Sequence, residues 1–370
     1  MVISLYRFII SQKSRNAYTR NLVINRLDYI KRIKAVKNIF AVFLCVVVAA
    51  LSFGCDNDKY EEPEITPQII FLFSPGGLGD LSYNDCILSG VQQFKKEHPE
   101  VDLFMYSPPS IEDAERIFSD WMKRPGSNIP VIFALASSDY EYMVDKYLED
   151  YALTDNKRIL LFESEKIYDD SHIHTFQVSM FGASYLAGVT ARECVEDAPC
   201  LVLLGSSTDT PVFSAFEGFK AGLGRECDLD FLADDWTGYV MAPQAYRMMG
   251  EWTQKYGFIF PVAGGSNTGI YRYSREYEDS PFLAGMDIDQ SSLSPKIVGS
   301  VVKKFDVLVN SYFSQWLATG TMPESQTYGL ESGYVEWELA PRFKLLYSVL
   351  VAMHMDAAVR NEIDYENAKN

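Results

Sequence analysis

Residues 71–84 read FLFSPGGLGDLSYN, an apolar strand that runs into a glycine-rich turn and then into polar residues that begin a helix. In open α/β sheets, ligands bind beyond the carboxyl ends of the strands, where the following helix offers free backbone N–H groups. Glycine lets the backbone turn through positive φ and approach a ligand closely. The turn also carries polar and aromatic side chains, namely Asp80, Ser82, Tyr83 and Asn84. We therefore expect a binding site at this junction, with an ordinary capped strand-to-helix turn as the alternative.

Beyond this junction the chain alternates strands with helices in two series of similar size. The first series has expected strands at 68–73, 101–106, 131–135, 159–162 and 174–178, with helices at 83–97, 111–122 and 140–151. A helix at 181–194 leads to the second series, with strands at 201–204, 231–233, 258–262 and 282–286 and helices at 212–222, 243–256 and 268–275. Helices at 295–317 and 343–361 come last, separated by a segment at 332–339. The alternation predicts a parallel α/β fold.

The composition predicts a folded, strongly acidic protein. A chain of 370 residues with 48% hydrophobic content is long enough to bury a large core, and its length favours two domains. The formal net charge is −17, but nine of the basic residues and one acid lie in residues 1–54. The remainder has 24 basic and 49 acidic residues, a charge of −25. Such a surface repels nucleic acid and anionic lipid, so neither is an expected partner.

The N-terminus has the order of a bacterial lipoprotein signal. A basic run at residues 31–37 precedes an apolar run at 39–53, which is short for a spanning helix and ends at Gly54-Cys55. Leu51 lies one position further from the cysteine than the usual leucine of such signals. We expect residues 1–54 to be removed, Cys55 to carry lipid and residues 55–66 to form a tether. An uncleaved single-span anchor is the alternative.

Four cysteines follow Cys55, namely Cys86, Cys194, Cys200 and Cys227. Cys194 and Cys200 bracket a short segment that a disulfide would close in an oxidising compartment. Burial of these cysteines as free thiols is an equally acceptable interpretation.

The sequence gives little support for an enzyme. It holds four histidines, and no phosphate-binding loop, zinc motif, nucleophile elbow or Cys/His dyad is found in it. His172 and His174 have the spacing of a metal pair, but we interpret them as part of a loop that precedes a strand. We expect neither a metal nor another cofactor.

Five blocks of the chain, in order, are similar to the basic membrane protein family, the substrate-binding lipoproteins that include purine nucleoside receptors of bacterial ABC importers. The blocks are SPGGLGDLSYN at 74–84, SYLAG at 184–188, FSAFEGFKAG at 213–222, AGGSNTG at 263–269, and GMDIDQ at 285–290 with SVVK at 300–303. The resemblance extends over residues 67–335.

The resemblance implies a type I periplasmic-binding-protein clamp, in which two doubly wound lobes joined by a hinge hold ligand between them. An N-terminal lobe would comprise residues 67–178, with a returning segment near 291–330. A C-terminal lobe would comprise residues 179–290, with 331–370 packed on it.

The resemblance also implies roles for residues at the two ends of a nucleoside. Tyr83 would stack on the base, with Asp80 and Asn84 as polar elements of the same turn. Asp287 would accept the ribose hydroxyls beside Lys303. A carboxylate can accept two hydroxyl protons while a nearby ammonium neutralises its charge. The alternatives are a turn residue for Asp287 and a solvated helix face for Lys303.

Further residues follow from the same resemblance. Backbone around Gly265 would line the cleft, and Asp139 would face the base. Trp236 or Tyr239 would supply a second stacking ring, with core packing as the alternative for Trp236.

The family pattern is not matched everywhere, which affects the expected ligand. Ser74 stands where the family has an acid, Gly79 replaces Asn or Asp, Leu81 replaces a basic residue, and Tyr83 replaces Phe. A purine nucleoside is the first expectation, and a sugar-like or other small polar solute is the second.

The expected function is that of a monomeric, lipid-anchored solute receptor in the cell envelope that delivers its ligand to an ABC permease. A ligand-sensing or surface-capture lipoprotein of the same fold is the alternative. An enzyme on the same scaffold is a third hypothesis, which turnover of the bound solute would distinguish.

Overall fold

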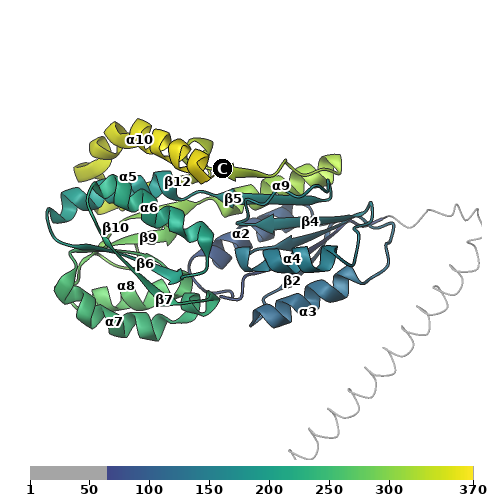
Figure 1. The fold of residues 1–370 in the computed structure, drawn as a ribbon, viewed down its shortest axis with the longest axis horizontal. Helices are drawn as coiled ribbons and strands as arrows, with labels where there is room; N and C mark the ends of the chain where they lie inside the picture. The colour runs from purple at the N-terminus through teal and green to yellow at the C-terminus, as the bar shows by residue number, and fades with distance from the viewer. Residues whose placement is uncertain (1–64, 370) are drawn as a thin grey trace, which may run out of the picture. The chain divides into compact units, whose positions relative to one another are not determined.

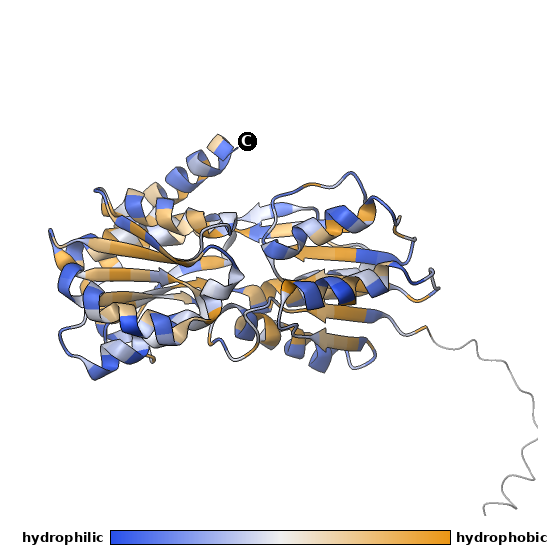
Figure 2. Ribbon diagram, turned by 60° about the horizontal axis from the view of Figure 1, so that its bottom comes forward, coloured by the Kyte–Doolittle hydropathy of each residue, from blue (hydrophilic) through white to orange (hydrophobic). Residues whose placement is uncertain are grey.

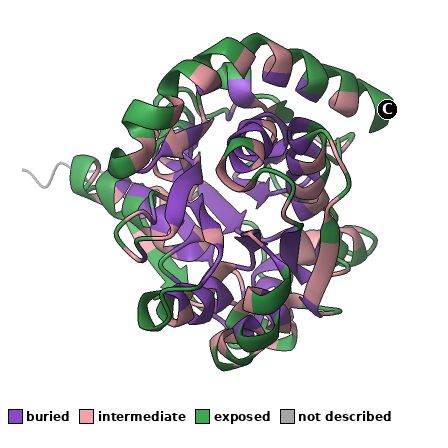
Figure 3. Ribbon diagram, turned by 90° about the vertical axis from the view of Figure 1, so that its left-hand side faces the viewer, coloured by how far each residue is buried: buried purple, intermediate pink, exposed green. Residues whose placement is uncertain are grey.

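Two six-stranded sheets form the framework of the computed structural model, which describes residues 65–369 (Figure 1). The predicted signal segment, Cys55 and most of the tether lie outside these residues. Apolar residues gather on the strands, and the exposed residues lie mainly on the outer sides of the helices (Figures 2 and 3). The predicted α/β fold with two doubly wound sheets is confirmed.

The first sheet has the order β2-β1-β3-β4-β5-β11, and all neighbouring strands are parallel. β3 reads VIFAL and is buried at every position, as expected of a strand covered by helices on both faces. The strands are β1 (Gln68–Leu72), β2 (Asp102–Tyr106), β3 (Val131–Leu135), β4 (Lys157–Phe162), β5 (Ile173–Val178) and β11 (Gln326–Tyr328). The associated helices are α2 (Tyr83–Glu97), α3 (Ile111–Met122), α4 (Glu141–Leu148) and α9 (Phe305–Thr319), with a 3₁₀ turn η1 (Ser138–Tyr140).

The second sheet repeats this order as β7-β6-β8-β9-β10-β12, with β12 antiparallel to β10. Its strands are β6 (Cys200–Ser206), β7 (Asp228–Ala233), β8 (Phe258–Val262), β9 (Phe282–Asp287), β10 (Ile297–Lys303) and β12 (Val335–Leu339). Its helices are α5 (Phe181–Val195), α6 (Phe213–Leu223), α7 (Ala242–Lys255), α8 (Asn267–Glu276) and α10 (Pro341–Lys369). Short 3₁₀ turns are η2 (Thr210–Val212), η3 (Trp236–Val240), η4 (Gly264–Ser266) and η5 (Leu330–Ser332).

The helix expected at residues 295–317 is wrong in its first part. Residues 297–303 read IVGSVVK and form strand β10, which pairs with β9 and β12. β-Branched residues favour extended backbone, and this run fills a central place in the sheet. The returning segment expected from residue 291 therefore includes a strand of the second sheet, and only α9 and β11 lie with the first sheet.

Close packing of α5 and α6 accounts for the glycines of two of the family-like blocks, SYLAG at 184–188 and FSAFEGFKAG at 213–222. A Cβ atom added to Gly188 would lie 2.1 Å from the carbonyl oxygen of Phe219, and one added to Gly222 would lie 1.9 Å from that of Tyr185. Both helices therefore need glycine where their backbones meet.

Three connections carry the chain between the two sheets. They are β5 to α5 through Ser179, β10 to α9 through Lys304, and β11 to β12 through residues 329–334. The four described cysteines, Cys86, Cys194, Cys200 and Cys227, are free thiols. Among residues 65–369, no helix combines the length and apolar character needed to span a bilayer.

Candidate ligand-binding site

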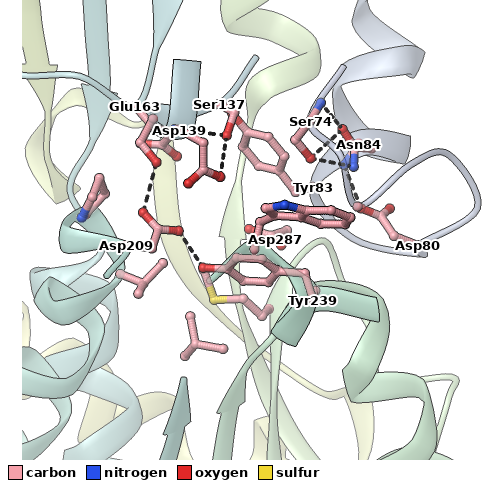
Figure 4. A pocket seen from close by; sticks show the side chains of 18 of the residues that line it. Ser74, Asp80, Tyr83, Asn84, Ser137, Asp139, Glu163, Asp209, Tyr239 and Asp287 are labelled. Atoms are coloured by element: carbon pink, nitrogen blue, oxygen red, sulfur yellow. Dashed lines mark hydrogen bonds between the residues drawn. The ribbon is translucent and has the colours of Figure 1, made fainter. Parts of the chain in front are cut away.

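The nine predicted binding residues line a single cavity (Figure 4). They are Asp80, Tyr83, Asn84, Asp139, Trp236, Tyr239, Gly265, Asp287 and Lys303. About 740 Å³ of space in this cavity is free of protein atoms, part of it open to solvent.

The topology of the sheets explains why these residues meet. In each sheet the strand order reverses beside the first strand of the series, at β1 and β3 in one and at β6 and β8 in the other. Ligands bind at such switch points, outside the carboxyl ends of the strands. The turn after β1, η1 after β3, the loop after β6 and η4 after β8 all contribute residues to the cavity.

The turn after β1 uses two of the predicted residues to hold itself in shape. The carboxylate of Asp80 accepts hydrogen bonds from the backbone N–H groups of Ser82 and Asn84, both at 2.9 Å, and of Asp85 at 3.2 Å. The Asn84 amide bonds to the Ser74 backbone and hydroxyl. Burial raises the pKa of Asp80 to about 6, although the three N–H groups oppose the shift. Both side chains are therefore partly committed to the turn.

The four positions at which the sequence departs from the family pattern fall into two groups, two that line the cavity and two that do not. Ser74 and Tyr83 line the cavity, whereas Gly79 and Leu81 do not. Leu81 is 45% exposed, and its N–H and that of Gly79 both donate to the carboxylate of Asp85. Positions 79 and 81 of this protein therefore contribute no side chain to the cavity wall.

Lys303 lies between two buried acids at one end of the cavity. Its ammonium donates to the Glu163 carboxylate at 2.7 Å and lies 3.5 Å from that of Asp287. Burial alone would lower the pKa of Lys303, but the two carboxylates outweigh it and raise this pKa. The Ser82 hydroxyl donates to Asp287 at 2.5 Å. Asp287 is therefore held between a cation and a hydroxyl, with acceptor capacity left for a ligand.

Two further acids that line the cavity, Asp139 and Asp209, lie near each other (Figure 4). Asp139 accepts a hydrogen bond from the Ser137 hydroxyl at 3.0 Å. Burial and the neighbouring charge of Asp209 raise the pKa of Asp139 to about 6. Asp209 accepts hydrogen bonds from the hydroxyls of Ser138, at 2.9 Å, and Tyr239. Burial raises the pKa of Asp209 as well, although these hydrogen bonds oppose the shift.

Three aromatic side chains contribute flat apolar surface, namely Tyr83, Trp236 and Tyr239. The Tyr83 ring meets Phe305 edge-on at 5.0 Å between centroids, and the Lys303 ammonium lies 5.2 Å from the Tyr83 centroid. The Tyr83 hydroxyl is buried and has no hydrogen-bond partner within residues 65–369. Tyr83 lines the cavity, so its hydroxyl is open to a hydrogen bond with a ligand there.

Sequence reasoning missed two of the acids, Glu163 and Asp209. Glu163 follows β4 directly and has φ 57°, and Asp209 follows β6 in a loop of small polar residues. Their position just beyond the carboxyl ends of buried strands is the signal that could have identified them.

The charge balance of the cavity restricts its ligand. Five carboxyl groups line it, from Asp80, Asp139, Glu163, Asp209 and Asp287, and within the described chain Lys303 is the only cationic side chain that lines it. Carboxylates accept hydrogen bonds from hydroxyl and N–H groups and repel anions. Among residues 65–369, no group of three or more His, Cys, Asp or Glu side chains is arranged to hold a metal ion.

Residues 68–357 match the family model described as ABC transporter substrate-binding protein PnrA-like. The chain belongs to this family. It is 23% identical over 314 residues to basic membrane protein A1 of Borrelia garinii subsp. bavariensis, an alignment that covers 81% of this chain and 87% of that one. It is 21% identical over 304 residues to basic membrane protein C of Borreliella burgdorferi, covering 75% of this chain and 81% of that one.

Solved structures share the fold. A solute-binding protein of an ABC transporter from Aeropyrum pernix K1 superimposes with a TM-score of 0.62 at 17% identity, covering 80% of this chain and 86% of that one. GanP, a glucose-galactose binding protein from Geobacillus stearothermophilus, gives a TM-score of 0.53 at 14% identity, with 74% and 98% covered.

As a member of this family, the protein is an extracytoplasmic substrate-binding protein of ABC transport and not an enzyme. Members of the family bind small molecules and work with ABC transporters. The expected family and fold are confirmed.

Proposed function

We propose that this protein captures an uncharged nucleoside in the cavity between its two sheets, with a purine nucleoside as the first candidate. The observation that carries the proposal is the combination of aromatic side chains with five carboxyl groups and one ammonium group in a single cavity. Flat rings suit a base, and carboxylates suit ribose hydroxyls and base N–H groups. Phosphate or carboxylate ligands are disfavoured because the acids outnumber the one lysine.

The nine residues predicted from the sequence form the binding set in this proposal. Asp287 accepts ribose hydroxyls, and Lys303 neutralises it. Asp139 faces the base beside Tyr83 and one of the rings of Trp236 and Tyr239. Asp80 and Asn84 shape the turn around Gly76. The backbone at Gly265 lines the cleft.

A sugar-like ligand is the second candidate, and the unpartnered hydroxyl of Tyr83 favours it. A ligand that contacts Tyr83 through its hydroxyl and not through its ring would be a sugar-like or other polar solute. Mass spectrometry of the small molecule that co-purifies with the protein would identify the class. Calorimetry with guanosine, ribose, galactose and guanosine 5′-phosphate would follow. Tight binding of the phosphate would contradict the proposal.

We further propose that the mature protein is anchored by lipid at Cys55 after removal of residues 1–54, and that its two lobes, 67–178 and 179–290 with their returning segments, close on ligand for delivery to an ABC permease. The order of basic run, apolar run and Gly54-Cys55 supports the anchor. Cys55→Ser should release the protein from the membrane fraction. Retention that still requires detergent would favour an uncleaved anchor.

A further inference from the structure

Helix α10 has an apolar face that no other element of residues 65–369 covers. One side of the helix packs on α5 and buries Val351 and Ala358. The opposite side exposes Leu345 by 94%, Val349 by 71% and Met353 by 75%. Figure 3 shows the outer side of α10 exposed along the edge of the molecule. Exposed apolar residues that stand singly are common, but these lie one helical turn apart on one face.

The spacing on this face is that of a helix-pairing seam. Arg342, Leu346, Val349, Met353 and Asp356 follow one another at alternating intervals of four and three residues. Apolar residues at this spacing form the contact line between two paired helices, whose axes then lie about 8–10 Å apart. The seam is apolar at its centre and charged at both ends.

The charged ends are complementary to each other when the helix meets a copy of itself in the opposite direction. In an antiparallel pair with its twofold axis at Val349, residues at equal distances on either side of Val349 lie level with each other. Leu345 of one copy then meets Met353 of the other, and Arg342 meets Asp356. Asp356 is exposed and forms no ion pair within residues 65–369. The Arg342 guanidinium donates through Nη2 to the backbone carbonyls of Ser291, Ser294 and Ile297, so its Nε and Nη1 groups are the donors left for Asp356 of the other copy.

We propose that α10 mediates self-association of this protein, with a second copy of the chain packed antiparallel on the face defined by Leu345, Leu346, Val349 and Met353. A twofold interface buries the same patch on both copies and so uses one self-complementary surface. The cavity lies between the sheets and is separate from this face, so both copies bind ligand.

The charge of α10 argues for a second copy and against a lipid surface. The helix carries four basic residues, Arg342, Lys344, Arg360 and Lys369, and four acidic residues, Asp356, Glu362, Asp364 and Glu366. Helices that lie on anionic membranes carry an excess of Lys and Arg on their polar face. A balanced helix with oppositely charged ends to its seam lacks this excess.

Cysteine crosslinking of the full chain in cell envelopes tests the proposal. Val349→Cys places one thiol of each copy beside the twofold axis, and mild oxidation should give a disulfide-linked band of twice the chain's mass. Ile167→Cys, at a position 79% exposed in the loop after β4, is the matched control and should stay single. A Val349→Cys band no stronger than that of Ile167→Cys would overturn the proposal.

Substitutions on the α10 face test self-association independently, by co-purification of two copies of the chain. Two differently tagged full-length copies should co-purify when expressed together. Val349→Glu sets two carboxylates against each other at the axis and should reduce co-purification at least tenfold, whereas Ile167→Glu should not. Unchanged ligand binding by Val349→Glu shows that the variant is folded. Equal co-purification by both variants would mean that the face binds a lipid surface or another protein, and would overturn the inference.

Discussion

The Lys303 ammonium donates a 2.7 Å hydrogen bond to Glu163, a residue 140 positions earlier in the chain, and both side chains are buried. Asp287 approaches the same ammonium at 3.5 Å. Glu163 and Asp287 have positive φ values of 57° and 68°, which non-glycine residues rarely adopt. Strained backbone at two acids around one cation is typical of functional sites, where surrounding structure holds the geometry.

Glu163→Gln should strongly destabilise the protein. The substitution keeps the shape of the side chain but removes one of the two charges that compensate Lys303. Breaking a buried ion pair typically costs about 3–5 kcal/mol, whereas an exposed pair is worth at most about 1 kcal/mol. Glu115→Gln is the matched control, because Glu115 pairs with Lys146 at the surface. Urea unfolding of the ligand-free proteins measures the difference. Equal losses of unfolding free energy for both variants would mean that Asp287 alone compensates the charge of Lys303.

Asp287→Asn should weaken ligand binding by roughly 30-fold or more. Truncating a buried, hydrogen-bonded charged partner typically costs about 2–5 kcal/mol, and about 1.4 kcal/mol corresponds to a tenfold change in affinity. Asp289→Asn is the control, because Asp289 lies two residues further on and is exposed. Calorimetry with the cognate ligand provides the measurement. Binding by Asp287→Asn within about twofold of the parent would mean that the ribose-end site lies elsewhere.

Substitutions of Tyr83 separate its ring from its hydroxyl. Tyr83→Ala should cost about 1–3 kcal/mol if the ring stacks on a base, by analogy with base stacking in nucleic-acid binding. Tyr83→Phe removes the buried hydroxyl that lacks a protein partner and should cost about 0.5–1.5 kcal/mol, or about 2- to 13-fold in affinity. Tyr106→Phe, at an exposed position of β2, is the control. No effect of Tyr83→Phe would show that the ligand does not contact the hydroxyl.

The titration of Asp139 predicts how stability depends on pH. The folded protein raises the pKa of this carboxyl from 3.8 to about 6, through burial and the charge of Asp209. A raised folded-state pKa gives stability that is complete below the unfolded-state pKa and is lost as the pH rises through the folded-state pKa. The contribution of Asp139 should therefore fall between about pH 4 and pH 6, by roughly 3 kcal/mol at about 1.4 kcal/mol per pKa unit.

Asp139→Asn should make this decline smaller, and the part due to Asp80, whose pKa burial also raises to about 6, should remain. Chemical unfolding of the ligand-free protein at pH 4, 5, 6 and 7 measures it, with Asp102→Asn on the exposed edge strand β2 as the control. A pH profile of Asp139→Asn that matches the parent would contradict the raised pKa of Asp139.

The sequence was sufficient for most of the architecture because buried strands and amphipathic helices have strong local signals. β10 was missed because its β-branched run passes directly into α9, and local periodicity cannot show that residues 297–303 pair with β9 and β12. Glu163 was missed because its partner Lys303 is distant in sequence. Asp80, by contrast, was predicted as a polar element of the binding turn. In the structure its carboxylate accepts three hydrogen bonds from backbone N–H groups, so it also has a structural role in the turn.

Closure of the two lobes on ligand gives the last prediction. Three hydrogen bonds already join the turn after β1 and η1 to the second lobe: Ser82 donates to Asp287 at 2.5 Å, Gln290 donates to the carbonyl of Leu81 at 2.8 Å, and Ser138 donates to Asp209 at 2.9 Å. These contacts describe a closed arrangement, in which ligand would be surrounded from both sides. A ligand that binds this arrangement more tightly than an open one must shift the population toward it and raise the melting temperature by linkage. Saturating guanosine should therefore reduce the radius of gyration in small-angle scattering, whereas guanosine 5′-phosphate, which the acidic cavity disfavours, should leave it unchanged. A nucleoside that calorimetry shows to be bound but that produces no compaction would count against a hinged receptor.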